Sequence, residues 1–276
     1  MILTALRSAI PVVAGATAAT FFLEDIRQLK CDSFSARTFD DYFPRGTWND
    51  NWDFRQPESL VNAKAYREAN EEEKKKLLDE HKATATRNIF LIRHGQYQLE
   101  SKDKFLTPLG REQAEYLGKR LANSTIKFDH LTMSTMNRAT ETANIILKSL
   151  PSDLQRSSSS LIEEGPPYPP VPDVGHWKPA KAEFFAESTR IESAFRKYIH
   201  RASPKQKEDS NEIYVCHANV IRYFICRALQ FPPEGWLRMS LGNCSLTWLV
   251  IRPSGRVSIK SIGDIGHLPV EKVSFT

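Results

Sequence analysis

The stretch Asn88-Ile-Phe-Leu-Ile-Arg93-His94-Gly95 decides how this chain folds, because an apolar run of strand length stops abruptly at a cation, an imidazole and a glycine. A buried parallel strand that ends there places Arg93 and His94 at its carboxyl end, which is the edge where α/β proteins bind ligands. A neutral imidazole can attack phosphorus, and a guanidinium can donate two hydrogen bonds to phosphate oxygens. Taken alone, the tripeptide fits a surface turn after a strand equally well.

Two further predicted strands end next to side chains that suit phosphate. Residues 212–216 form an apolar strand that stops at His217, and a helix is expected over 220–229. A strand over 128–134 is followed by Arg138 near the start of another helix, and both a guanidinium and a helix amino terminus favour phosphate. These patterns predict that His94, His217 and Arg138 meet in one pocket.

The remaining elements predict an α/β sheet with helices on both faces. Thr107 fits a helix N-cap and Pro108 the first helical position. A helix is expected over 180–200, and strands over 246–251 and 257–262 flank a Pro-Ser-Gly turn, which predicts a hairpin.

A proline-rich loop over residues 157–172 is expected to lie across the rim of the pocket. It contains Glu163 and Glu164, and either carboxyl group is a candidate proton donor. His176 and Trp177 follow and are expected to line the mouth of the pocket.

Composition excludes some classes of partner and site. The chain of 276 residues has 38 Lys and Arg against 33 Asp and Glu, a net charge of +5, and its basic residues are spread out, so nucleic acid is not the expected partner. The four cysteines (31, 216, 226 and 244) show no zinc-site spacing. Cys216 and Cys226 have apolar neighbours and are expected to be buried thiols.

The amino terminus is expected to address the protein to a membrane. Residues 8–23 carry no charge, which is slightly short of the roughly 20 apolar residues of a membrane helix. A cleaved secretory signal and a mitochondrial presequence are alternatives. We favour an uncleaved single-pass anchor over residues 1–30.

Residues 31–87 are expected to form a linker. Its first half, to Pro57, is rich in Pro, Gly, Asp and Asn and contains Trp48 and Trp52. Two tryptophans exposed in a polar linker favour an interface, although both rings could instead fold back onto their own domain. Residues 58–82 are predicted to form one charged helix with i,i+4 Glu–Lys pairs.

Jointly, these positions resemble the histidine phosphatase superfamily, of which the phosphoglycerate mutases are the namesake branch. The matching segments occur in the family's order: Arg93-His94-Gly95, Thr107-Pro108-Leu109-Gly110, Arg138 with Glu141-Thr142, Glu164-Gly165 and His217. The closest likeness is to the mitochondrial Ser/Thr protein phosphatase branch, through the amino-terminal apolar segment, the paired tryptophans and Cys-His-Ala-Asn-Val-Ile-Arg at 216–222. Asn49 departs from that branch, which usually has Asp there.

The resemblance implies a phosphoglycerate mutase-like three-layer α/β/α sandwich with a mostly parallel central sheet over residues 88–276. It implies that His94 becomes a phosphohistidine, that Arg93, Arg138 and His217 (as imidazolium) hold the phosphate oxygens, and that Glu164 protonates the leaving group. The three cationic groups would take the place of a metal, so neither a metal nor a cofactor is expected.

The resemblance further implies phosphoprotein substrates and an anchor in a mitochondrial membrane, outer or inner. It also implies self-association into homo-oligomers, through a motif of Trp48, Trp52 and Asp53.

Two other functions compete with a protein phosphatase. A phosphoglycerate mutase or small-phosphoester phosphatase shares the same pocket, but a mutase needs a lid and no long insertion follows Glu164. A mitochondrial membrane scaffold with a vestigial site is a function of another class, and the intact set of site residues argues against it.

Overall fold

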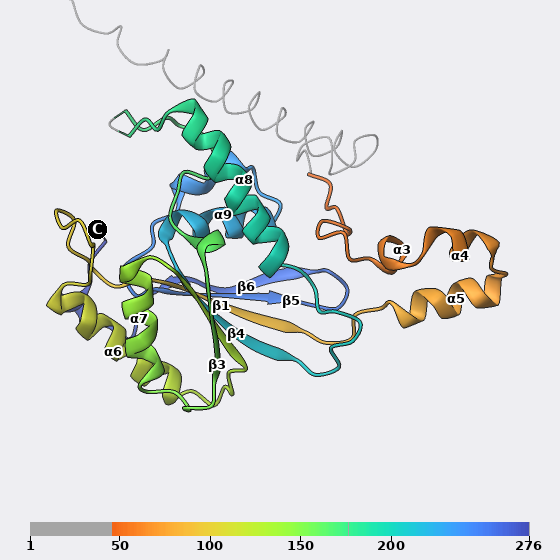
Figure 1. Ribbon diagram of the computed structural model, residues 1–276, viewed down its shortest axis with the longest axis horizontal. Coiled ribbons are helices and arrows are strands. Elements are labelled where there is room, and N and C mark those ends of the chain that lie inside the picture. Colours follow the sequence, from red (N-terminus) through yellow and green to blue (C-terminus); the bar gives the residue numbers. More distant parts are fainter. Residues whose placement is uncertain (1–45, 176, 276) are drawn as a thin grey trace, which may run out of the picture. The chain divides into compact units, whose positions relative to one another are not determined.

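The computed structural model describes residues 46–175 and 177–275, and the chain from Asn49 onward forms one compact unit (Figure 1). The predicted anchor over 1–30, the linker up to residue 45, Cys31 and His176 lie outside the described residues. Within the ranges that are described, no helix is both long and apolar enough to cross a membrane.

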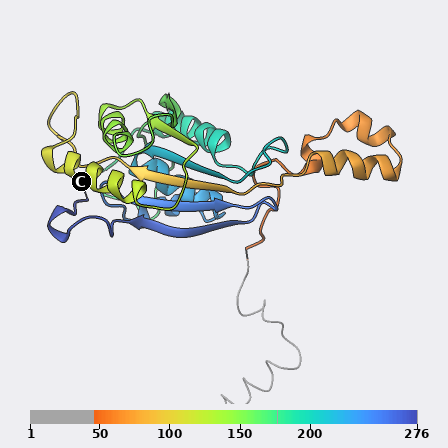
Figure 2. The same ribbon diagram turned by 90° about the horizontal axis from the view of Figure 1, so that it is seen from below.

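A six-stranded sheet forms the centre of this unit (Figures 1 and 2). The strands are β1 (Arg87–Arg93), β2 (His130–Ser134), β3 (Gln155–Ser159), β4 (Ser210–Cys216), β5 (Leu246–Ile251) and β6 (Val257–Asp264), in the order β3-β2-β4-β1-β5-β6. The first four strands in this order are parallel, whereas β5 pairs antiparallel with both β1 and β6. The sheet is therefore mixed, and the predicted hairpin is confirmed by β5 and β6.

Helices cover both faces of the sheet because β1 contributes alternate side chains to two separate cores. Phe90 and Ile92 pack with α6 (Pro108–Ala122) and α7 (Asn137–Leu147). Ile89 and Leu91 pack with α8 (Lys181–Tyr198) and α9 (Ala218–Ala228). Successive side chains of a strand point to opposite faces, so a strand covered on both faces needs apolar residues at every position. This explains the unbroken apolar run at the start of the domain.

Local sequence signals position several of these elements as expected. The Thr107 side chain accepts a hydrogen bond from the Gly110 backbone, and Pro108 begins α6. The structure adds three short 3-10 helices, η1 (Ser160–Ile162), η2 (Pro233–Arg238) and η3 (Val270–Lys272). It also adds β3, an edge strand rich in serine that lies partly within the stretch predicted to be a loop.

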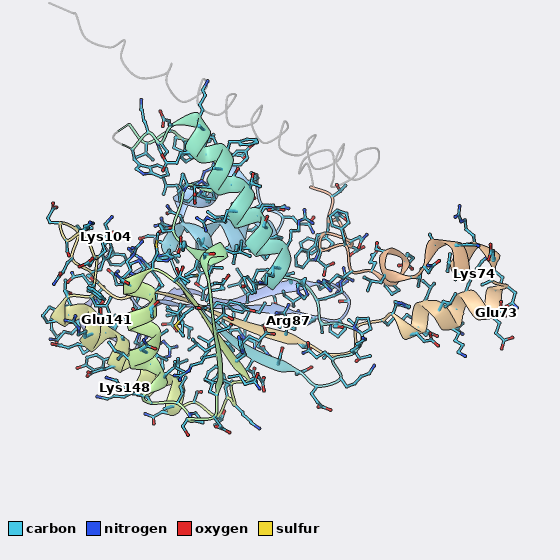
Figure 3. The ribbon with its side chains drawn as sticks, viewed as in Figure 1. Glu73, Lys74, Arg87, Lys104, Glu141 and Lys148 are labelled. Atoms are coloured by element: carbon cyan, nitrogen blue, oxygen red, sulfur yellow. The ribbon has the colours of Figure 1, made fainter. Side chains whose placement is uncertain are left out.

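The single helix predicted over 58–82 is wrong. The segment forms three helices, α3 (Pro57–Leu60), α4 (Ala63–Glu68) and α5 (Glu71–Glu80), and Figure 3 labels Glu73 and Lys74 on the last of them. Asn62 caps α4, and Asn70 forms a capping box with Glu73. The asparagine side chains bond to the backbone more favourably at helix starts than inside a helix, so they divide the charged run.

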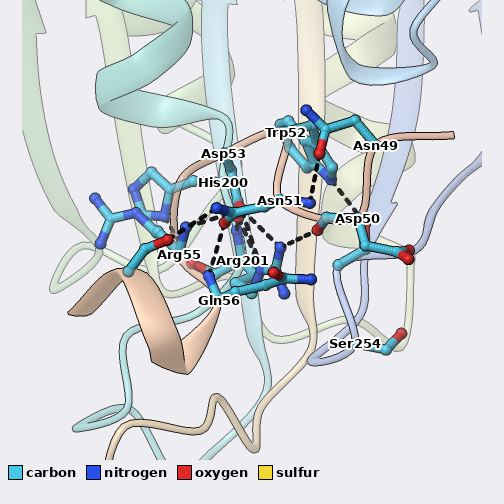
Figure 4. Close-up of polar contacts among 12 residues, drawn as sticks. Asn49, Asp50, Asn51, Trp52, Asp53, Arg55, Gln56, His200, Arg201 and Ser254 are labelled. Atoms are coloured by element: carbon cyan, nitrogen blue, oxygen red, sulfur yellow. Dashed lines mark hydrogen bonds and ion pairs between the residues drawn. The ribbon is translucent and has the colours of Figure 1, made fainter. Parts of the chain in front are cut away.

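The expectation that both linker tryptophans are exposed is also wrong for Trp52. Its side chain is only 6% exposed, its Nε1 donates a hydrogen bond of 2.8 Å to the carbonyl of Gly255, and its ring packs on Phe195. Asp53 is equally buried and accepts hydrogen bonds from the guanidinium and backbone of Arg201 (Figure 4). Trp48 alone remains exposed, at 39%.

The segment holding Trp52 and Asp53 therefore lies at the amino end of β1. The turn that contains Gly255 follows β5, and the last residue of β5, Ile251, pairs with Arg87 at the beginning of β1. His94 follows the other end of the same strand, so these two sets of predicted site residues occupy opposite edges of the sheet.

Candidate active site

Three parallel strands bring the predicted residues together at one edge of the sheet. β1 and β4 are neighbours in a register that pairs Arg93 with Cys216, so the next residues, His94 and His217, emerge side by side. Their ring centroids are 5.1 Å apart. β2 ends on the other side of β4 at Ser134, whose hydroxyl lies 2.8 Å from Nε2 of His217.

His94 is held in the tautomer that leaves Nε2 unprotonated. Its Nδ1 lies 2.8 Å from the carbonyl oxygen of Gly95, which can only accept, so Nδ1 carries the proton. Nε2 in turn accepts a hydrogen bond of 3.2 Å from Nε of Arg138. Burial, together with the positive charges of Arg93 and Arg138, lowers the pKa of His94 well below its usual range. The imidazole is therefore neutral and nucleophilic at pH 7.

Arg138 contacts the His94 ring, and Arg93 lies within electrostatic range of it. Arg138 is in the first turn of α7 and stacks its guanidinium over Tyr97 at 4.8 Å. Arg93 donates from Nη1 to the Leu241 carbonyl at 2.7 Å, which fixes the direction of its side chain. Burial lowers the pKa of Arg93 to about 10, so the group remains charged at neutral pH.

His217 differs from the imidazolium that the resemblance implies. Burial, with the neighbouring His94 and Arg138, lowers the pKa of His217 well below its usual range, so its ring is neutral in this structure. Within the described part of the chain, its Nδ1 is buried and has no hydrogen-bond partner. That nitrogen is the one available to a ligand, because Nε2 is bonded to Ser134.

The two candidate proton donors, Glu163 and Glu164, have different surroundings in the structure. Glu163 is bonded through Oε1 to the hydroxyl of Thr135. Burial raises the pKa of the Glu164 carboxyl above its usual range. The positive charges of Arg138, Arg93 and Arg222 act in the opposite direction but are outweighed. A raised pKa suits a carboxylic acid that donates a proton near neutral pH.

Backbone contacts fix the loop that carries His94. The Gly95 N–H donates to the Thr142 hydroxyl at 3.0 Å, and the Gln96 N–H donates to the Gln113 side chain at 2.9 Å. The carbonyl of His94 accepts from the Cys244 N–H at 3.2 Å and from Asn243. The loop of His94 is thus held by residues from both α6 and α7 and by the turn before β5.

Several residues of this pocket were not assigned a role by sequence reasoning. Ser134 ends the predicted strand over 128–134, and Arg222 belongs to the quoted segment 216–222, so position relative to a strand end could have signalled both. Tyr97 and Asn243 lie in loops and give no such signal. Trp177, expected at the mouth, packs against Phe184 and Trp236.

Comparison with known proteins agrees with this geometry. A sequence model of the histidine phosphatase superfamily (branch 1) matches residues 89–163 and 173–264. The chain is 73% identical over 240 residues to the protein named serine/threonine-protein phosphatase Pgam5, mitochondrial, of Caenorhabditis elegans, which covers 87% of this chain and 84% of that protein. It is 54% identical over 233 residues to the human protein of the same name, with coverage of 83% and 80%.

A solved structure is also similar. The phosphoglycerate mutase of Plasmodium falciparum is 33% identical, and the match covers 70% of this chain and 100% of that chain with a TM-score of 0.49. The resemblance inferred from the motif residues is confirmed by the family match and by the curated relatives.

Proposed function

Since this chain belongs to the histidine phosphatase superfamily, we propose that it is a serine/threonine-protein phosphatase that hydrolyses phosphoproteins through a phosphohistidine on His94. The name shared by its relatives, mitochondrial serine/threonine-protein phosphatase, supports the substrate class. The observation on which the proposal rests is the fixed tautomer of His94, whose Nε2 lone pair lies among Arg93, Arg138 and His217.

In the first step, Nε2 of His94 forms a bond to phosphorus while the bond to the serine or threonine oxygen breaks. Arg93, Arg138 and Nδ1 of His217 hold the equatorial oxygens, where negative charge is spread in the transition state. A phosphate dianion beside His217 raises the pKa of that imidazole, because an opposite charge favours the protonated form. Glu164 gives its proton to the leaving alkoxide.

In the second step, water attacks the phosphohistidine and the bond from phosphorus to Nε2 breaks. Glu164, now a carboxylate, takes the proton of that water and returns to its acid form. Inorganic phosphate leaves, and His94 is again neutral with Nε2 unprotonated. The protons balance over the two steps, because Glu164 gives one and takes one.

The test is phosphate release from a phosphoserine peptide by wild-type protein and by His94→Ala. The wild type should accumulate an acid-labile phosphoryl-enzyme in a rapid quench, and His94→Ala should form none and release no phosphate. His81→Ala, at the end of α5, is the matched control and should behave as wild type. Wild-type rates in His94→Ala would refute the proposal, and isomerisation of 3-phosphoglycerate by the wild type would favour a mutase.

We also propose the domain organisation and location expected from the sequence: an anchor over 1–30, a linker over 31–87 and the phosphatase domain over 88–276, on a mitochondrial membrane. The relatives are named mitochondrial, which supports the compartment. Self-association through Trp48, Trp52 and Asp53 belongs to the same proposal. Alkaline carbonate extraction of mitochondria tests the anchor, since an anchored protein stays in the pellet and removal of residues 1–30 should release it.

A further inference from the structure

Glu164, the proposed proton donor, is not part of a helix or a strand. It follows the 3-10 helix η1 and precedes Gly165 and Pro166, so regular secondary structure does not fix its direction. A general acid must lie within hydrogen-bond reach of the leaving oxygen to be effective. The turn that carries Glu164 therefore needs support from elsewhere in the fold.

Arg190 on α8 supplies that support through the backbone of the turn. Its Nη1 donates to the carbonyl oxygens of Leu161 at 2.8 Å and Glu163 at 2.9 Å, and more weakly to that of Ser160 at 3.3 Å. Its Nη2 donates to the carbonyl of Glu164 itself at 3.3 Å. One guanidinium thus binds four carbonyls within five consecutive residues, including the carbonyl of the proton donor.

The Arg190 side chain is itself held in place by its neighbours. Its Nε donates to Oε2 of Glu187, one helical turn earlier, at 3.1 Å, and Nη2 bonds to the same oxygen. Gly165, the residue after Glu164, packs directly on this ion pair: a Cβ atom there would lie 2.1 Å from Glu187 Oε2 and 2.8 Å from Arg190 Nη2. A side chain at this position would require the ends of Glu187 and Arg190 to shift.

The turn is also bonded on its other side. Asn219, in the first turn of α9 and two residues after His217, donates from Nδ2 to the carbonyl of Gly165 at 3.4 Å. Glu164 is thus flanked by carbonyls that α8 and α9 bind, while its carboxyl is within electrostatic range of Arg138, Arg93 and Arg222.

We propose that Arg190 is a positioning residue for proton transfer, which holds the backbone of residues 160–164 so that the Glu164 carboxyl faces the leaving oxygen. This rests on the proposed function, in which Glu164 is the acid. The planar guanidinium of arginine spreads five donors over three nitrogens and can bind the turn and Glu187 at once, whereas lysine has only three donors on one nitrogen. Arg190→Lys therefore keeps the charge near Glu187 and loses the support of the turn.

The experiment compares two substrates that differ in their need for an acid. A phosphoserine peptide leaves a basic alkoxide that must be protonated, whereas 2,4-dinitrophenyl phosphate leaves a stable phenolate that need not be. Arg190→Lys should lower kcat/KM on the peptide by about 10- to 100-fold, part of the roughly 10²–10⁴-fold that general acid catalysis contributes. This parameter reports phosphoryl transfer to His94 and not the later hydrolysis, in which Glu164 acts as a base whichever substrate was used. On the aryl ester kcat/KM should stay near the wild-type value, and the pH dependence of kcat/KM on the peptide should lose its alkaline limb.

Arg196→Lys is the matched control, because Arg196 lies on the same helix and pairs with Glu192 instead. It should leave kcat/KM near the wild-type value on both substrates. Equal losses on both substrates in Arg190→Lys would mean a general structural role and would overturn the proposal, as would unchanged peptide turnover.

Glu164→Gln separates this proposal from the proposed function. If Glu164→Gln shows the loss confined to the peptide and Arg190→Lys does not, Glu164 remains the acid and only the role of Arg190 is refuted. If Glu164→Gln shows no such selectivity, the assignment of the acid itself is wrong. In the double variant, Arg190→Lys should add no further loss to Glu164→Gln, because residues that act through one another are not additive.

Discussion

Gly95 and Gly110 face each other so closely that a Cβ atom on Gly95 would lie 2.5 Å from the carbonyl oxygen of Gly110. A Cβ atom on Gly110 would lie only 1.9 Å from the carbonyl of Gln96. Thr107 also bonds to Gln96: its backbone N–H donates to the carbonyl, and its hydroxyl donates to the side chain and more weakly to the carbonyl. The amino end of α6 is thereby pressed against the loop that carries His94.

Gly110→Ala should therefore impair both stability and catalysis. The added methyl group forces the α6 backbone away from Gln96, and overpacking of this kind costs about 1–3 kcal/mol of unfolding free energy. Chemical denaturation and phosphopeptide kinetics would measure the two effects. Gly46→Ala is the control, because a Cβ atom at Gly46 meets nothing within 4 Å. If Gly110→Ala matched this control, the tight contact would be unimportant.

Arg138→Ala should lower kcat/KM by about 10- to 100-fold, because it removes charge-assisted hydrogen bonds worth about 1.5–3 kcal/mol each. It should also raise the pKa of His94, since Arg138 repels a proton from that ring. The pH below which activity falls should then move upward, as a pH–rate profile would show. Arg156→Ala, on the exposed edge strand β3, should leave both values unchanged.

Asp53→Asn should destabilise the fold by about 3–5 kcal/mol, because it leaves the Arg201 guanidinium buried without its counter-charge. Urea denaturation measures this loss. Asp50→Asn is matched in chemistry but exposed, and only the Asp50 backbone carbonyl contacts Arg201, so it should be neutral. Similar midpoints for the two variants would show that the buried pair contributes little.

Replacement of Trp48 and Trp52 should have different consequences. Trp52→Ala should cost about 3–5 kcal/mol of stability, as expected for a buried aromatic ring. Trp48→Ala should change stability by less than about 0.5 kcal/mol, as surface substitutions usually do, so it is the variant that tests self-association. We expect a smaller assembly by light scattering and lower activity, and an unchanged assembly size would count against the interface.

Stability should fall as the pH is lowered from about 6.5 to about 4. Burial and neighbouring arginines lower the pKa of both His200 and His267 to about 4 in the folded protein. In that window the unfolded chain binds protons on these histidines and the folded chain does not, so protons favour unfolding. His94 and His217 act in the same direction. Thermal melts would show the decline, and His267→Gln should make it shallower; an unchanged slope would contradict the role of His267.

The sequence predicts the core of the site well because its signals are local. Arg93, His94 and His217 end apolar runs, and the carboxyl ends of neighbouring parallel strands must meet at one edge. Trp52 could not be placed, because its hydrogen-bond acceptor is the carbonyl of Gly255, 203 residues away in the sequence. The role of Arg190 could not be predicted for a related reason. It binds backbone carbonyls of a distant turn, and nothing in its sequence context distinguishes it from other arginines on a helix surface.

The charged segment after Pro57 shows another limit of prediction from sequence, which concerns where helices begin and end. Its periodicity describes a helix correctly, but the competition between the helix backbone and the side chains of Asn62 and Asn70 decides where each helix begins. An asparagine either caps the start of a new helix or lies inside a continuous one, and the path of the preceding chain decides between the two. A count of charged pairs does not contain that information.

The adjacency of β1 and β4 has a consequence for how such an enzyme can diversify. Neighbouring strands lie about 4.7–4.9 Å apart because peptide hydrogen bonds set that spacing, and the two imidazoles that follow them are 5.1 Å apart. The spacing of the two imidazoles thus follows from the pairing of the strands and not from the surrounding loops. The surrounding loops can therefore change in length or sequence to suit new protein targets, while the two imidazoles keep their spacing.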